Sequence, residues 1–187
     1  MALLNSLFLD PTAKDMYRYV ALTASLILFH FLITGFIAPG RMRGKIFTPE
    51  FMENFKTIHE RHFGDGNNAV SKVPKEGYPD MGNGRFSDKM TYKQWFEFNV
   101  AQRIHYHYLE SVTSVICWIL IAGLVYPEIT IALGGGFFLG RVLFHIGYAV
   151  KGPKGRSIGF LLQLACSFTL GVFSFISSIR IGVNQAK

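Results

Sequence analysis

The chain has 187 residues, of which 50% are hydrophobic and 15% aromatic, and its formal net charge at pH 7 is +7. This is the length of one ordinary domain, and a mean hydropathy of +0.27 is high for a soluble protein. The basic excess is therefore expected to face anionic lipid headgroups and not nucleic acid. The two cysteines, Cys117 and Cys166, both lie in apolar stretches and form neither a CxxC metal pair nor a disulfide framework.

The first apolar block predicts a membrane-spanning helix over residues 17–38. About 20 apolar residues, each rising 1.5 Å, cross a hydrocarbon core roughly 30 Å thick. The dipeptide Pro39-Gly40 is expected to end this helix. A long polar loop, residues 39–94, follows, and the apolar residues at helical spacing within 50–62 predict a short surface helix.

Three more spans are predicted over residues 95–125, 129–150 and 157–181. The long first loop and the connection over residues 151–156 are both basic, which places them on the cytoplasmic or matrix side of the membrane. The predicted fold is an all-α membrane protein, a four-transmembrane-helix bundle that forms a single domain over residues 1–187.

Polar and charged side chains lie within the two middle spans, where a charge costs about 2.5 to 3.5 kcal/mol unless a partner receives it. They recur at helical spacing, so that each set shares one face: Arg103, His107, Glu110 and Ser114 on the second span, and Arg141, His145 and Tyr148 on the third. Counted from the basic side, Glu110 lies roughly 16 Å deep and Arg141 roughly 14 Å deep. This match predicts a structural Glu110–Arg141 pair.

Nearer the basic surface, an anion entering the membrane would meet Arg103, Arg156 and either Arg41 or Arg43. Guanidinium groups bind carboxylates through paired hydrogen bonds, so these residues predict a site for an anionic ligand at the rim of an apolar groove. A plainer alternative is that the arginines extend to the headgroups and bind no ligand.

The spacing of the histidines does not predict a metal site. The segment His59-Glu-Arg-His62 is one residue short of the zinc-binding His-Glu-x-x-His pattern, so we expect no metal there. His30 is expected to be a hydrogen-bonded interior residue. A haem held by His105 or His107 together with His30 or His145 is a more distant alternative.

Several ordered motifs resemble the family of membrane-associated proteins in eicosanoid and glutathione metabolism (MAPEG), most closely its third microsomal glutathione S-transferase type. The second span matches through Phe98, Asn99, Gln102, Arg103, His105 and Glu110, and the turn after it through Ala122, Gly123, Leu124, Tyr126 and Pro127. The third span and the next loop match through Gly140, Arg141, Leu143, Gly147, Tyr148, Pro153, Arg156 and Gly159. Tyr78-Pro79 with Met81 resembles a short motif of the family before the second span.

The resemblance implies a four-helix protomer that assembles as a homotrimer and binds glutathione between neighbouring protomers. The glutathione-binding residues that it implies are Arg103, Glu110 and Tyr148, with His107 at an asparagine position of the family, and we add Arg41 from the residue argument above. Arg156 would be catalytic, because a guanidinium beside the glutathione sulfur favours the nucleophilic thiolate. The implied reaction is conjugation of glutathione to a lipophilic electrophile or reduction of a lipid hydroperoxide.

Some positions depart from the family pattern. His107 replaces an asparagine, Phe144 replaces a tyrosine, Thr113 replaces a proline, and the first loop is longer than usual for the family. These departures favour an alternative, a catalytically weak or inactive homologue that serves as a structural subunit of a larger membrane complex, for example in the mitochondrial inner membrane. The sequence leaves both the endoplasmic reticulum and a mitochondrial membrane open as locations.

Overall fold

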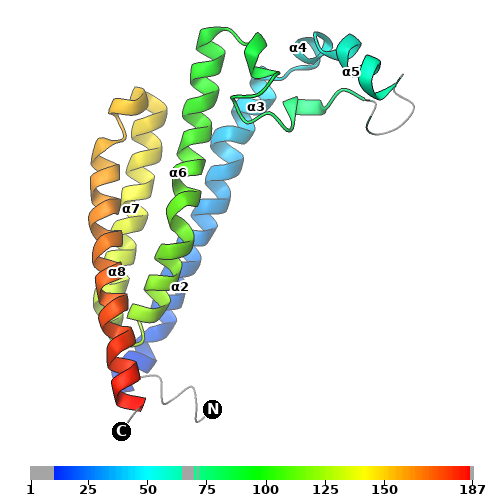
Figure 1. The fold of residues 1–187 in the computed structure, drawn as a ribbon. Coiled ribbons are helices and arrows are strands. Elements are labelled where there is room, and N and C mark those ends of the chain that lie inside the picture. The colour runs from blue at the N-terminus through cyan, green and yellow to red at the C-terminus, as the bar shows by residue number, and fades with distance from the viewer. Residues whose placement is uncertain (1–10, 65–69, 71, 186–187) are drawn as a thin grey trace. The chain divides into compact units, whose positions relative to one another are not determined.

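Four long helices dominate the protein (Figure 1). The computed structural model describes residues 11–64, 70 and 72–185, and these contain no β-strand. The long helices are α2 (Pro11–Gly35), α6 (Tyr92–Ala122), α7 (Pro127–Lys151) and α8 (Ser157–Gln185). Shorter helical segments are η1 (Phe36–Gly40), α3 (Arg41–Ile46), α4 (Pro49–Glu53), α5 (Lys56–Phe63), η2 (Lys75–Gly77), η3 (Ser87–Lys89) and η4 (Gly152–Lys154).

Three of the described segments are long and apolar enough to cross a membrane: Thr12–Ile46, Pro127–Lys154 and Ser157–Asn184. The fourth long helix, α6, has 31 residues and would extend roughly 46 Å. Its hydropathy is lowered by the polar residues between Asn99 and Ser114. The predicted fold class, an all-α membrane protein built as a four-helix bundle, is confirmed.

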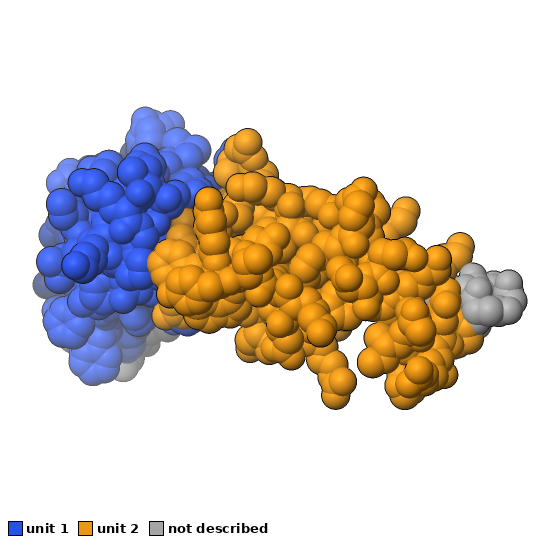
Figure 2. Space-filling model, turned by 90° about the horizontal axis from the view of Figure 1, so that it is seen from above, with its two compact units in different colours: residues 1–32, 106–187 blue, residues 33–105 orange. Residues whose placement is uncertain are grey.

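The chain divides into two compact units, which Figure 2 shows in blue and orange. We call residues 1–32 with 106–187 the bundle unit and residues 33–105 the loop unit. All four long helices contribute to the core of the bundle unit, through Val20, Ala24 and Ile27 of α2, Tyr108, Val112, Val115 and Ile119 of α6, Phe137 of α7, and Cys166 and Leu170 of α8. Large apolar side chains such as Leu22, Phe29 and Phe168 are exposed, as lipid-facing residues of a membrane bundle must be.

The predicted end of the first helix at Pro39-Gly40 is wrong. The chain passes through η1, which is a π-helical turn containing Pro39, and continues directly as α3. Gly40 has helical dihedral angles, φ −62° and ψ −47°. Proline cannot donate the usual backbone hydrogen bond, and a local change to π-helical bonding allows the helix to pass it. The helix predicted over residues 50–62 is also divided, into α4 and α5.

A buried arginine organises the loop unit. Arg43 is 2% exposed, and its guanidinium donates hydrogen bonds to the carbonyl oxygens of Glu76, at 3.0 Å, and Asp80, at 2.6 Å. The guanidinium carbon also lies 4.0 Å from the centre of the Tyr78 ring. Arg43 therefore holds the loop before α6 against α3, a structural role that the sequence did not distinguish from anion binding.

The carboxylate of Asp80 accepts hydrogen bonds from other residues of the same loop. It accepts hydrogen bonds from the N–H groups of Gly82, Gly84 and Ser87 and from the Ser87 hydroxyl, at 2.8 to 3.0 Å. Burial alone would raise the pKa of Asp80, but these four hydrogen bonds outweigh it, so the pKa lies below its ordinary value. The loop is therefore stabilised by the ionised form of this carboxyl group.

We expect Asp80→Asn to destabilise the loop unit by about 1.5 to 3 kcal/mol at pH 7, since hydrogen bonds to an ionised group are lost. Because the folded pKa of Asp80 is depressed, its contribution is fully present above the unfolded pKa of about 3.9 and is lost as pH falls through the lower folded value. Hydrogen exchange of the amides over residues 72–90 should separate wild type from variant at pH 7, and this difference should shrink as the pH is lowered through the unfolded pKa of about 3.9. The exposed Asp88→Asn is the control, and an equal effect of both substitutions at pH 7 would contradict the prediction.

Candidate functional site

The predicted site residues are distributed over both units. The bundle unit contains His107 and Glu110 on α6, Arg141 and Tyr148 on α7, and Arg156 immediately before α8. The loop unit contains Arg41, at the start of α3, and Arg103, on the first half of α6. Each group is described within its own unit.

Arg141 is the centre of the bundle unit's polar residues. Only 1% of it is exposed, although it lies on a membrane-spanning helix. Its Nη1 donates to His107 Nδ1, at 2.8 Å, and to Gln163 Oε1, at 2.9 Å. The guanidinium carbon lies 4.0 Å from the centre of the Tyr108 ring and 4.8 Å from that of Phe144. One cation thus joins α6, α7 and α8.

The contact with Arg141 fixes the chemical form of His107. A guanidinium has donors and no acceptor, so His107 Nδ1 must accept and the imidazole proton must lie on Nε2. The imidazole also stacks on the ring of Phe144, with centroids 4.7 Å apart and an interplanar angle of 21°. The two positions that depart from the asparagine and tyrosine of the family pattern are therefore in direct contact.

Gln163 was missed by the sequence analysis. It is 3% exposed and supplies an oxygen to Arg141 from α8. The available signal was a glutamine in the first half of the span over residues 157–181, whose other polar residues are hydroxyl side chains and Arg180. The predicted Glu110–Arg141 pair stays a prediction, and the hydrogen bonds of Arg141 to His107 and Gln163 are additional partners that it did not include.

Tyr148 and Arg156 come together at the end of α7. Tyr148 is 6% exposed and stacks on Phe144, with centroids 5.5 Å apart. The guanidinium carbon of Arg156 lies 5.6 Å from the centre of the Tyr148 ring. The close approach that allows this contact depends on glycine, because a Cβ on Gly147 would collide with the backbone of Gly155.

The outer face of α6 in the bundle unit is polar. Glu110, Thr113 and Ser114 are all exposed there, in the middle of a membrane-spanning bundle. A carboxylate and two hydroxyl groups are costly in hydrocarbon unless a polar partner covers them. These exposed polar groups mark this part of α6 as a candidate ligand-contacting face.

Two residues of the family-like motif on α6 have structural partners in the loop unit. Asn99 Nδ2 donates to the carbonyl oxygen of Gly82, at 3.0 Å, and Gln102 Nε2 donates to that of Met81, at 3.3 Å. Arg103, the next residue of α6, is half-buried, and Arg41 is exposed. Similarity of sequence alone does not separate residues that hold this loop from residues that bind a ligand.

His30 is half-buried in the bundle unit and contacts aromatic side chains there. Its Nδ1 lies 3.4 Å from the hydroxyl of Tyr108, and its ring lies 5.1 Å from that of Phe138. The Tyr108 hydroxyl donates to the carbonyl oxygen of Ile27, at 3.0 Å. Among the residues described, no group of three or more His, Cys, Asp or Glu side chains is placed to hold a metal ion.

The comparison with known families agrees with this arrangement. The model of the MAPEG family matches residues 19–176, which covers all four long helices in whole or in large part. No solved structure matches the chain. The family match extends over most of the sequence, and the four-helix membrane bundle is the fold expected of that family. The chain therefore belongs to the MAPEG family.

Proposed function

We propose that this protein is a glutathione-dependent membrane transferase or peroxidase, of the third microsomal glutathione S-transferase type, that acts on lipophilic electrophiles or lipid hydroperoxides. The observation that carries the proposal is the contact between Arg156 and Tyr148 at the end of α7. It puts a permanent cation and a phenol together, beside a membrane bundle whose family uses glutathione.

In this proposal Arg156 favours the thiolate of glutathione over the thiol. In the transferase reaction the thiolate attacks the electrophile, a carbon–sulfur bond forms, and the leaving group departs with the electron pair of the broken bond. In the peroxidase reaction two glutathione molecules are oxidised to the disulfide while the hydroperoxide is reduced to an alcohol and water. Arg103, Glu110 and Arg41 would bind the charged ends of glutathione, and His107 would contact it at the position where the family has an asparagine.

In this proposal single-domain protomers assemble as a homotrimer, as membership of the MAPEG family suggests. Thr113 and Ser114, which are exposed on α6, would lie at the contact with a neighbouring copy. The membrane that contains the assembly would be the endoplasmic reticulum or a mitochondrial membrane.

Calorimetry with the purified protein tests the proposal. We expect glutathione to bind with a micromolar-to-millimolar Kd, and Arg103→Ala to weaken binding roughly 10- to 150-fold, as the loss of about 1.5 to 3 kcal/mol from a charge-assisted hydrogen bond implies. The matched control is Arg180→Ala, since Arg180 is exposed and lies near the other end of α8 from Arg156. Binding that is insensitive to Arg103 would place the ligand elsewhere.

A second candidate function is a structural subunit of a larger membrane complex. The contact between His107 and Phe144 favours it, because this stack and the bond to Arg141 engage His107 inside the bundle. If wild-type protein binds no glutathione in calorimetry but purifies from native membranes with stoichiometric partner subunits, this second function replaces the first.

A further inference from the structure

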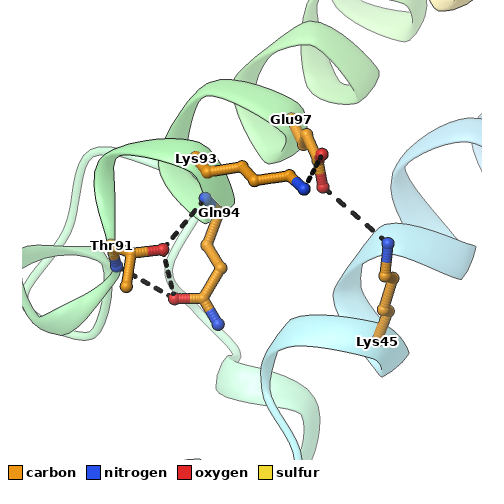
Figure 3. Close-up of polar contacts among 5 residues, drawn as sticks. All are labelled: Lys45, Thr91, Lys93, Gln94 and Glu97. Atoms are coloured by element: carbon orange, nitrogen blue, oxygen red, sulfur yellow. Dashed lines mark hydrogen bonds and ion pairs between the residues drawn. The ribbon is translucent and has the colours of Figure 1, made fainter.

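The first turns of α6 carry exposed aromatic residues. The helix begins at Tyr92 and not at residue 95, because Thr91 and Gln94 form a reciprocal cap (Figure 3). The Thr91 N–H donates to Gln94 Oε1, at 2.9 Å, and the Gln94 N–H donates to Thr91 Oγ1, at 3.3 Å. This capping box fixes the orientation of the first turns of α6.

These first turns have two different faces. On one face the Glu97 carboxylate lies 3.8 Å from Lys45 Nζ of α3 and 3.9 Å from Lys93 Nζ (Figure 3). On the other, Tyr92, Trp95 and Phe96 are 77%, 40% and 39% exposed. Their rings contact one another, with centroids 5.8 Å apart for Tyr92 and Trp95 and 6.2 Å apart for Tyr92 and Phe96. We call these three residues the aromatic face.

We propose that the aromatic face lies in the headgroup region of the lipid bilayer and fixes the depth of α6. Tyrosine and tryptophan are enriched at this level, where a ring contacts acyl chains while its polar atom contacts water and headgroups. Lys89, which precedes α6 and is exposed, can contact anionic phosphates at the same level.

The length of α6 agrees with this assignment. From Trp95 to Ala122 the helix rises roughly 40 Å, which is the thickness of a bilayer with its headgroups. Near Ala122, the bundle unit has a second group of aromatic residues and arginines. There the Tyr17 hydroxyl donates to the carbonyl oxygen of Leu120, at 3.2 Å, and the guanidinium carbon of Arg180 lies 5.4 Å from the centre of the Tyr126 ring. The bundle unit therefore has aromatic and cationic side chains of its own near the end of α6.

This depth assigns positions to the polar residues of α6. Arg103 follows Trp95 by eight residues and would lie roughly 12 Å below the headgroup level along the helix. Glu110 would lie roughly 22 Å below it, near the middle of the membrane.

Tryptophan fluorescence tests the proposal, because the chain has two tryptophans, Trp95 and Trp118. In Trp118→Phe protein reconstituted into vesicles of phosphatidylcholine and phosphatidylglycerol, emission comes from Trp95 alone. Nitroxide lipids labelled at the headgroup should quench it at least twofold more than lipids labelled near the end of the acyl chain. The control is Leu109→Trp in a Trp95→Phe, Trp118→Phe background. Leu109 is 50% exposed and lies about 21 Å further along α6, so this control should show the opposite order.

Three outcomes would overturn the proposal. Quenching of Trp95 by aqueous acrylamide without quenching by any labelled lipid would mean that the aromatic face projects into water. Quenching by neither would mean that a second copy of the chain or another protein covers the face. Stronger quenching by the deep label than by the headgroup label would place α6 at another depth.

Discussion

Gln163→Met is expected to lower the free energy of unfolding by about 2 to 3 kcal/mol, because it removes a hydrogen bond to a buried cation. Methionine nearly matches glutamine in volume, so the packing between α7 and α8 should change little. The guanidinium of Arg141 would lose its acceptor on α8, at 2.9 Å, and no water is available in hydrocarbon to replace it. Unfolding of the purified protein by SDS in mixed micelles measures this change.

A double-mutant cycle separates the loss of this bond from a general defect of α8. In an Arg141→Met background, Gln163→Met should cost less than about 1 kcal/mol, since the cation that makes the missing oxygen costly is gone. Thr169→Val is the control on the same helix, because the Thr169 hydroxyl bonds to its own helix, at Ala165. An equal cost of Gln163→Met in both backgrounds would show that Gln163 acts independently of Arg141.

The long helices could be predicted from the sequence because their signal is local. Two predicted spans, over residues 129–150 and 157–181, correspond closely to α7 and α8. Any stretch of about 20 apolar residues satisfies its backbone within a helix and its side chains in lipid, whatever the rest of the chain does. The passage of the first helix through Pro39 could not be predicted in this way, because proline usually ends a helix and the π-helical turn is the rarer solution.

The contacts of Arg141 could be predicted only in part. Helical rise gives the depth of a residue, and depth pointed to Glu110. The Glu110 pair stays a prediction. Depth alone does not show which other side chains lie beside Arg141, and it did not indicate the hydrogen bonds to His107 and Gln163. Similarly, the motif on α6 marked Asn99 and Gln102 without showing that they bond to Gly82 and Met81.

Gly159→Ala is expected to separate α7 from α8 and to cost about 1 to 3 kcal/mol of unfolding free energy, or more, through overpacking. A Cβ on Gly159 would collide with the backbone of Phe144 and Gly140 on α7, and backbone atoms cannot rotate away as a side chain can. The control is Gly135→Ala on α7. A Cβ there meets no atom within 4 Å, so this substitution should be neutral or stabilise the helix by up to about 1 kcal/mol.

The same variant links helix contact to the polar centre of the bundle unit. Gly159 lies one helical turn before Gln163, so a separation of the helices at Gly159 should also lengthen the bond from Arg141 to Gln163. In a Gly159→Ala background, Gln163→Met should therefore lower the free energy of unfolding by less than its roughly 2 to 3 kcal/mol in wild type. Because neighbouring sites are coupled, the two costs should differ by more than about 0.5 kcal/mol, the usual limit of additivity for independent sites. If the full cost persists while Gly159→Ala is itself destabilising, α7 and α8 have adjusted locally, and the close approach at glycine does not position the partner of Arg141.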